Sequence, residues 1–185
     1  MATIQRIQPM AGQILIRELE ARDLPGLEWE GQFTHYRHLY ADAYKRAQQN
    51  LSVLWVAEDQ NHRLIGQVFI QLICDRHDLA DGVMRAYLYG FRTRPEVRSQ
   101  GVGTQMVQVV ENDLINRNFK ILTLNVAQIN LRAQHLYRRL GFAITAFEPG
   151  HWSYVDHRGV HRHVNEPAWR MEKDLLLWRE TQEGQ

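Results

Sequence analysis

A segment with two closely spaced glycines, Arg98-Ser99-Gln100-Gly101-Val102-Gly103, separates a strand pattern from an amphipathic helix pattern near the middle of the chain. Glycine lets a backbone turn tightly and approach a ligand closely, and free N–H groups at a helix N-terminus favour phosphate oxygens. The segment is not a Walker loop, because no Gly-Lys-Ser/Thr follows, and it lacks the third glycine of the dinucleotide fingerprint. It therefore predicts either a tight strand-to-helix turn or a cradle for phosphate.

Charge is unevenly distributed around this glycine loop. Between Arg92 and Arg139 the chain carries eight Lys or Arg residues against three acids, whereas its net charge is only +1. A local positive surplus suits a polyphosphate ligand, although solvated helix faces also account for part of it. The nearly neutral whole argues against a general nucleic-acid binder and against a protein that binds membrane surfaces.

Composition and length predict one globular domain, 1–185. Apolar residues make up 44% and charged residues 23% of the 185 positions, which excludes wholesale disorder. A chain of this length can bury a sizeable core without disulfides. The single cysteine, Cys74, cannot form an internal disulfide and favours a reducing, cytoplasmic compartment. No apolar run reaches the length of a membrane span, and no signal peptide is expected.

Hydrophobic periodicity alternates between strands and helices along the chain. The predicted strands are 13–18, 51–57, 64–74, 83–93, 120–126, 142–147 and 168–175. The predicted helices are 32–49, 102–115 and 131–140. An antiparallel first half followed by alternating strands and helices predicts a single domain of the α+β or α/β class.

A second motif, Asn130-Leu131-Arg132-Ala133-Gln134-His135-Leu136-Tyr137-Arg138-Arg139-Leu140-Gly141-Phe142, begins 27 residues after Gly103. It resembles the N-x-x-A-x-x-L-Y-x-x-x-G-F segment of the GCN5-related N-acetyltransferase (GNAT) superfamily. The glycine loop resembles that family's R/Q-x-x-G-x-G/A acyl-CoA loop, and 93–98 is similar to its strand-end V-x-P-x-x-R. The closest match covers 83–145, and the order of strands and helices extends it over most of the chain.

The resemblance implies an α+β fold with three layers, in which helices flank a mixed, mostly antiparallel sheet. Its fourth and fifth strands, here 83–93 and 120–126, would splay apart. Acetyl-CoA, the co-substrate, would place its pantetheine arm along the end of the fourth strand and its pyrophosphate on the glycine loop. The implied cofactor-binding residues are Phe91, Arg92, Thr93, Arg98, Ser99, Gln100, Gly101, Val102, Gly103, Thr104, Asn130 and Tyr137.

The resemblance also places the hydroxyl of Tyr137 beside the thioester sulfur, which makes Tyr137 the implied catalytic residue. Aminolysis of a thioester forms a tetrahedral oxyanion, which a strand N–H can stabilise, and a thiolate, which a positioned phenol can protonate. Asn130 precedes Tyr137 by two helical turns, so both can face one cleft. The alternatives are that Tyr137 is a core aromatic packed against Leu140 and that Asn130 is a helix N-cap.

The general base is less evident from the sequence. Many members of the family carry a glutamate on the fourth strand, and this chain has Tyr87 at that place. A phenol with an ordinary pKa of about 10 is a poor base at neutral pH. By the strand period of two, Tyr87, Tyr89, Phe91 and Thr93 are predicted to share one face, so Tyr87 and Tyr89 either bind substrate or are core aromatics. A water relay to a distant acid, or an amine that arrives neutral, would replace a direct base.

Two segments are expected, by resemblance, to wall the acceptor site. The first, 18–30, is rich in acids, which would attract a cationic amine or merely stabilise helix N-termini. The second, 150–167, is predicted to form a hairpin insertion that turns at 156–159. Trp152 and Tyr154 share one face of this hairpin and are candidate substrate-binding residues, because long segments inside compact domains are often functional.

The four histidines of 150–167 raise the question of a metal, because a His-x-His pair can chelate. The family's chemistry needs no metal, so none is expected. A solvated, pH-sensitive hairpin is the simpler interpretation.

Three functions are compatible with these patterns. The first is an acetyl-CoA-dependent N-acetyltransferase that acts on a primary amine by direct attack, with protein N-terminal amines and small amines both open as acceptors. The second, suggested by the missing glutamate, is a non-catalytic acyl-CoA-binding sensor or partner module, although the retained Tyr137 favours the enzyme. The third is a metal-binding interaction protein built on the histidine-rich hairpin. The sequence leaves the oligomeric state open, a homodimer included.

Overall fold

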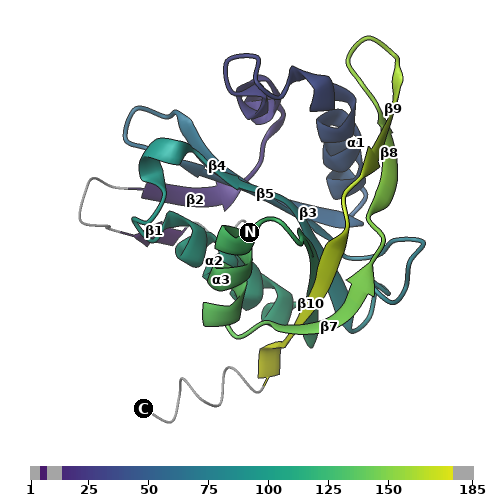
Figure 1. Ribbon diagram of the computed structural model, residues 1–185. Helices are drawn as coiled ribbons and strands as arrows, with labels where there is room; N and C mark the ends of the chain where they lie inside the picture. Colours follow the sequence, from purple (N-terminus) through teal and green to yellow (C-terminus); the bar gives the residue numbers. More distant parts are fainter. Residues whose placement is uncertain (1–4, 8–13, 177–185) are drawn as a thin grey trace.

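Within the residues that the structure describes, the main sheet contains eight strands, and its central strands β3 (Ser52–Glu58) and β4 (Leu64–Gln71) are almost entirely buried. The computed structural model describes residues 5–7 and 14–176 (Figure 1). The other strands of this sheet are β1 (Gln5–Ile7), β2 (Ile14–Glu18), β5 (Arg85–Thr93), β6 (Ile121–Ala127), β7 (Ala143–Glu148) and β10 (Ala168–Asp174). They lie in the order β1-β2-β3-β4-β5-β6-β10-β7, and neighbours are antiparallel except β5 and β6, which are parallel. The predicted α+β fold with a mixed, mostly antiparallel sheet is confirmed.

Helices cover both faces of the sheet and complete the three layers (Figure 1). One face carries the 3₁₀ helices η1 (Ala21–Glu28) and η2 (Thr34–Tyr36) and the helix α1 (Arg37–Gln48), and the other carries α2 (Val102–Asn116) and α3 (Leu131–Arg139). Residues 53–57 of β3 are all apolar because the strand is buried on both faces. Trp55 packs into the core under α2, and Leu54 packs into the core under α1. A strand buried on both faces loses the usual alternation of polar and apolar residues.

Several predicted boundaries differ from the structure. The helix predicted over 32–49 becomes α-helical only at Arg37, after a 3₁₀ turn, and a short 3₁₀ helix η3 (Pro95–Val97) precedes the glycine loop. The strand predicted over 64–74 ends at Gln71. Strand β1 and helix η1 were not predicted, and residue 13 of the predicted strand 13–18 lies outside the described residues. No helix in the described part of the chain is long and apolar enough to span a membrane.

The fourth and fifth predicted strands, β5 and β6, separate at their ends. Their parallel ladder pairs Arg85 with Ile121 and continues only to Leu88 and Leu124. Strand β5 nevertheless continues to Thr93, so its last five residues have no ladder partner on the β6 side. This confirms the predicted splay, and it frees backbone N–H and C=O groups that a sheet would otherwise pair.

A β-bulge in β5 changes which side chains share a face. Arg92 lies opposite Gln67 and Tyr89 lies opposite Phe69, so β5 contains one residue more than β4 over this stretch. Gly90 absorbs the extra residue with a φ of 58°, and a Cβ there would lie 3.1 Å from the Phe69 ring. Tyr89 therefore packs toward α1, whereas Phe91 packs toward α2 and α3. The prediction that Tyr87, Tyr89, Phe91 and Thr93 share one face is wrong for this reason.

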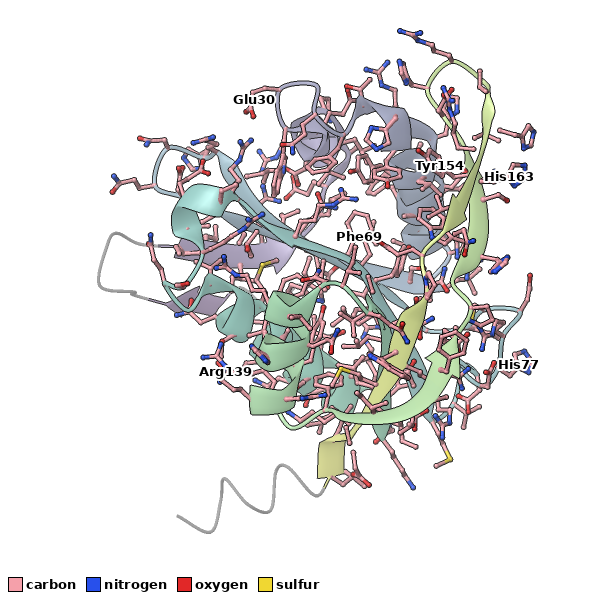
Figure 2. The ribbon with its side chains drawn as sticks, viewed as in Figure 1. Glu30, Phe69, His77, Arg139, Tyr154 and His163 are labelled. Carbon is pink, nitrogen blue, oxygen red and sulfur yellow. The ribbon has the colours of Figure 1, made fainter. Side chains whose placement is uncertain are left out.

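The predicted hairpin forms a separate two-stranded sheet of β8 (His151–Val155) and β9 (His161–Asn165). Its turn is organised by the buried carboxylate of Asp156, which accepts hydrogen bonds from the backbone N–H groups of Arg158 (2.9 Å) and Val160 (3.0 Å). Arg162 also donates to it over 2.8 Å. The hairpin lies beside α1, with Tyr154 on the side that faces α1 and His163 on the outer side (Figure 2).

Candidate active site

A cleft of about 1030 Å³ opens where β5 leaves β6, and most of the predicted cofactor-binding residues line it. The predicted residues on its wall are Phe91, Arg92, Thr93, Arg98, Ser99, Gly101, Gly103, Thr104, Asn130 and Tyr137. Gln100 and Val102 do not line the cleft with their side chains. The Gln100 amide donates to the Glu96 carbonyl (2.8 Å), and Val102 is buried in the core.

The glycine loop ends in a helix start that no side chain caps. Ser99 and Gly101 adopt left-handed conformations with φ of 62° and 85°, which turn the chain into α2. Gly101 is the N-cap residue, and the first helical hydrogen bond runs from the Gln105 N–H to its carbonyl (3.0 Å). The N–H groups of Val102, Gly103 and Thr104 therefore have no partner within the helix. Such a helix start suits an anion such as a phosphate.

Close packing explains the second glycine of the loop. A Cβ on Gly103 would lie 3.3 Å from the ring of Phe91 and 3.7 Å from the side chain of Leu136. The first turn of α2 thus approaches both β5 and α3 closely. Of the predicted basic surplus, four residues line the cleft, namely Arg92, Arg98, Arg132 and Arg139, with Arg139 on α3 (Figure 2).

Tyr137 is both a core aromatic and a residue of the cleft wall, so the two interpretations are compatible. Its side chain is only 6% exposed, and its ring centroid lies 6.4 Å from that of Phe91 and 5.6 Å from that of Phe142. Burial raises the pKa of its hydroxyl well above the usual range. The hydroxyl therefore keeps its proton at neutral pH, which is the state that a proton donor requires.

Asn130 caps α3, as one of the two sequence interpretations predicted. Its side-chain oxygen accepts a hydrogen bond from the N–H of Ala133 over 3.1 Å. Asn130 also lines the cleft. The cap therefore fixes the start of the helix that presents Tyr137 to the same cleft.

Tyr87 and Tyr89 are absent from the wall of this cleft. Their rings stack on each other with centroids 6.0 Å apart and nearly parallel planes. Burial raises the pKa of each phenol to about 12. Neither phenol can therefore accept a proton as a base at neutral pH, and both are placed to shape the α1 side of β5.

Most acids of segment 18–30 form ion pairs with arginines. Four of its acids bind arginines, in the pairs Asp23–Arg17 (2.7 Å), Glu20–Arg22 (2.9 Å), Glu28–Arg37 (2.6 Å) and Glu30–Arg94 (2.8 Å). These pairs largely neutralise the acids. This pairing favours a structural role for these four acids over an acidic rim that attracts a cationic amine.

The hairpin aromatics do not line the main cleft but reach it through a row of rings. Tyr154 and Trp152 lie 5.0 and 6.4 Å, centroid to centroid, from Tyr36, and Tyr36 stacks on Phe33 of the cleft wall at 6.5 Å. Trp152 is 41% exposed. A smaller hollow of about 330 Å³ lies on the hairpin itself. Within the described residues no group of three or more His, Cys, Asp or Glu is arranged to hold a metal ion.

The sequence did not reveal that the link between η1 and η2 forms part of the cleft wall. Trp29, Gln32 and Phe33 line the cleft, and Trp29 has a φ of 45°. The available signal was a pair of aromatic residues flanking Gly31, which interrupts the helical period. A break in periodicity between two aromatic residues is a weak sign of a binding loop. In the structure Trp29 is buried and Phe33 is half-buried.

The splayed central strands beside an uncapped helix start agree with the acyl-CoA cleft that the resemblance implied. A family model described as the Acetyltransferase (GNAT) family matches residues 15–142. The chain belongs to this family.

Solved structures share the fold at low sequence identity. The ribosomal-protein-S18-alanine N-acetyltransferase from Escherichia coli is 22% identical, with 88% of this chain and 94% of that chain covered and a TM-score of 0.65. The spermidine/spermine N-acetyltransferase SpeG from Vibrio cholerae is 18% identical, with coverages of 91% and 96% and a TM-score of 0.68. Ard1 from Thermoplasma volcanium is 18% identical, with coverages of 87% and 97% and a TM-score of 0.66. At these identities the likeness concerns the fold.

Proposed function

We propose that the protein is an acetyl-CoA-dependent N-acetyltransferase that acts on a primary amine. The observation that supports this most strongly is that one cleft contains both the uncapped start of α2 and the buried phenol of Tyr137. A polyphosphate site and a proton donor are what thioester aminolysis with CoA as leaving group requires. The lone Cys74 is a free thiol, which fits our further proposal that the enzyme works in the reducing cytoplasm.

Two elements bind different parts of the donor, acetyl-CoA. The unpaired N–H groups of Val102, Gly103 and Thr104, with the turn at 98–101, receive the pyrophosphate. The backbone of Phe91, Arg92 and Thr93, which has no ladder partner in β6, receives the amides of the pantetheine arm. The Thr93 carbonyl accepts a hydrogen bond from the Arg98 Nε over 3.2 Å, which the arm would displace. Asn130 holds α3 against this end of the cleft.

In the proposed reaction, one residue of this protein, Tyr137, transfers a proton to the leaving group. Acetyl-CoA supplies a thioester, whose attack by a neutral amine gives a tetrahedral oxyanion and then a thiolate leaving group. An N–H at the free edge of β5 stabilises the oxyanion. As the intermediate collapses, its ammonium nitrogen loses a proton to water and Tyr137 donates its proton to the departing thiolate sulfur. Solvent then returns a proton to Tyr137. Tyr87 and Tyr89 stay protonated, so the amine arrives neutral or loses its proton to water rather than to this strand.

The test is acetyl-CoA turnover, measured as free thiol, across a panel of small amines and peptide N-termini. The names of the similar structures include an enzyme for a protein alanine and one for spermidine, so both classes belong in the panel. We expect thiol release that depends on the amine. Tight CoA binding without turnover for any amine would instead support the non-catalytic acyl-CoA-binding module.

The hairpin is proposed to contribute to the choice of acceptor. Replacing both Trp152 and Tyr154 by Ala removes the rings that contact Tyr36. We expect KM for the amine to rise while the affinity for acetyl-CoA is unchanged, as when uniform binding is lost. His161→Ala, an exposed change on the neighbouring strand, is the control. If the double variant changes the affinity for acetyl-CoA and leaves the amine KM unchanged, the hairpin belongs to the donor side of the cleft and not to the acceptor side.

A further inference from the structure

Arg92 is held in an unusual setting on the α1 face of β5. Its guanidinium carbon lies 4.1 Å from the ring centroid of Phe33 and 4.9 Å from that of Tyr36. Its Nη1 donates to the hydroxyl of Tyr40 over 2.6 Å. Two aromatic faces and one phenol thus fix the plane and position of this cation.

Arg92 has no carboxylate partner in the described part of the chain. Its neighbour Arg94, by contrast, is paired with Glu30 through two hydrogen bonds of 2.8 Å. The acids that act electrostatically on Tyr36 and Tyr40 are Glu166 and Glu28, and Glu28 is already bound by Arg37 and Thr34. Since a guanidinium has five N–H donors, most of the hydrogen-bonding capacity of Arg92 is unused.

The position of Arg92 links it to the acceptor rather than to the donor. The bulge at Gly90 sends the side chain of Phe91 toward Tyr137 and that of Arg92 toward the opposite face of β5. That face carries η2, α1 and, through Tyr36, the hairpin aromatics. Arg92 nevertheless lines the same cleft as Tyr137. The cation therefore lies on the side of β5 away from the glycine loop and α3, but within the same continuous cavity.

The charge of this site distinguishes acceptor classes. A fixed, permanently charged guanidinium repels a second cation and binds a carboxylate through two parallel hydrogen bonds. Three acids of 18–30, Asp23, Glu28 and Glu30, offset little of this charge, because arginines already bind them. A polyamine would place positive charge against Arg92, whereas an amine with a nearby carboxylate would complete its hydrogen bonds.

We propose that Arg92 binds a carboxylate of the acceptor, so that the substrate is an amine bearing a carboxylate rather than a polyamine. Free amino acids and peptides that begin with an acidic residue both offer this chemistry. The proposal rests on the proposed N-acetyltransferase function and names its substrate class. Trp29, Phe33 and Phe91 line the cleft beside the cation and favour an acceptor that also carries apolar surface.

The test compares kcat/KM within matched acceptors. One set is phenylalanine, phenylalaninamide and phenethylamine, another is peptides beginning with Glu or Gln, and spermidine is the polyamine. We expect the wild type to prefer a carboxylate-bearing member by at least about tenfold, which corresponds to ~1.4 kcal/mol. A preference within the phenylalanine series identifies the carboxylate as that of a free amino acid, and a preference for the Glu peptide identifies it as the side chain of an acidic first residue. Arg92→Gln should abolish it, and Arg92→Lys should keep part of it.

Controls separate this proposal from a role of Arg92 in donor binding. Arg63→Gln, which removes an exposed cation paired with Glu96, should leave the preference intact. Because Arg92→Gln retains the backbone of β5, its affinity for CoA, measured by calorimetry, should stay within about threefold of wild type. An equal loss of CoA affinity and of turnover would overturn the proposal, as would spermidine or the amide being the better acceptor.

The failure of the proposed function is distinguishable from the failure of this inference. If an amine is turned over without preference for a carboxylate, the function stands and the role of Arg92 falls. If no amine is turned over, titration of each carboxylate-bearing acceptor into the CoA complex decides the inference. Binding lost in Arg92→Gln supports it, and no binding to the wild type overturns it.

Discussion

Tyr137→Phe is expected to lower kcat by about 10²–10⁴-fold, the usual contribution of a positioned general acid. The substitution keeps the ring that packs against Phe91 and Phe142 and removes only the hydroxyl, so the melting temperature should barely change. Because the hydroxyl acts mainly in the transition state, acetyl-CoA affinity should change by less than about tenfold. Steady-state kinetics on a competent acceptor and calorimetry with CoA supply the two measurements.

The pH profile and a second phenol sharpen this test. The raised pKa of Tyr137 means that the hydroxyl remains the donor throughout the neutral and mildly alkaline range. Its ionisation should therefore cause no fall in kcat below the ordinary phenol pKa of about 10. Tyr87→Phe, which alters a half-buried tyrosine outside the cleft wall, should reduce kcat much less. Near-wild-type kcat in Tyr137→Phe would leave Tyr137 a packing residue.

Gly103→Glu is expected to weaken CoA binding by at least tenfold, about 1.4 kcal/mol. The new side chain and its negative charge would lie where the unpaired N–H groups at the start of α2 would receive the pyrophosphate. Its Cβ would meet the Phe91 ring at 3.3 Å, which requires only a small shift of that ring. The fold should therefore survive, as circular dichroism and thermal melting can establish before the calorimetric titration.

Gln108→Glu is the matched control for charge. Gln108 is an exposed residue of the same helix and lies outside the cleft wall. The same change in net charge at that position should leave CoA affinity within about twofold of wild type. Unchanged affinity in a folded Gly103→Glu protein would remove the phosphate site from the glycine loop.

Glycine and capping residues predicted the turns and helix ends, which depend on only a few neighbouring residues. The glycine loop and the motif ending at Gly141 and Phe142 mark strand-to-helix and helix-to-strand junctions, where glycine and capping residues determine the backbone within a few positions. The cap at Asn130 and the turn at 156–159 belong to the same class. Tyr137 and the start of α2 lie on one cleft. The family resemblance, rather than these local signals, indicated which residues form the candidate donor site.

Features that depend on distant pairings were not predictable from a single sequence. The bulge at Gly90 is defined by the register of β5 against β4, and it moves Phe91 and Arg92 to faces that a period of two assigns wrongly. The insertion of β10 between β6 and β7 joins strands far apart in the chain. The pairing of Glu30 with Arg94, 64 residues away, neutralises an acid that sequence alone counts as free.

The most direct test of amine acetylation is the stoichiometry of the reaction on the best acceptor. Free CoA thiol and acetylated amine are measured in the same samples, by thiol titration and mass spectrometry, for the wild type and Tyr137→Phe. The account predicts equal amounts of the two products from the wild type, formed at a much lower rate in the variant. Thiol without acetylated amine, or no product from a protein that binds CoA tightly, would contradict it.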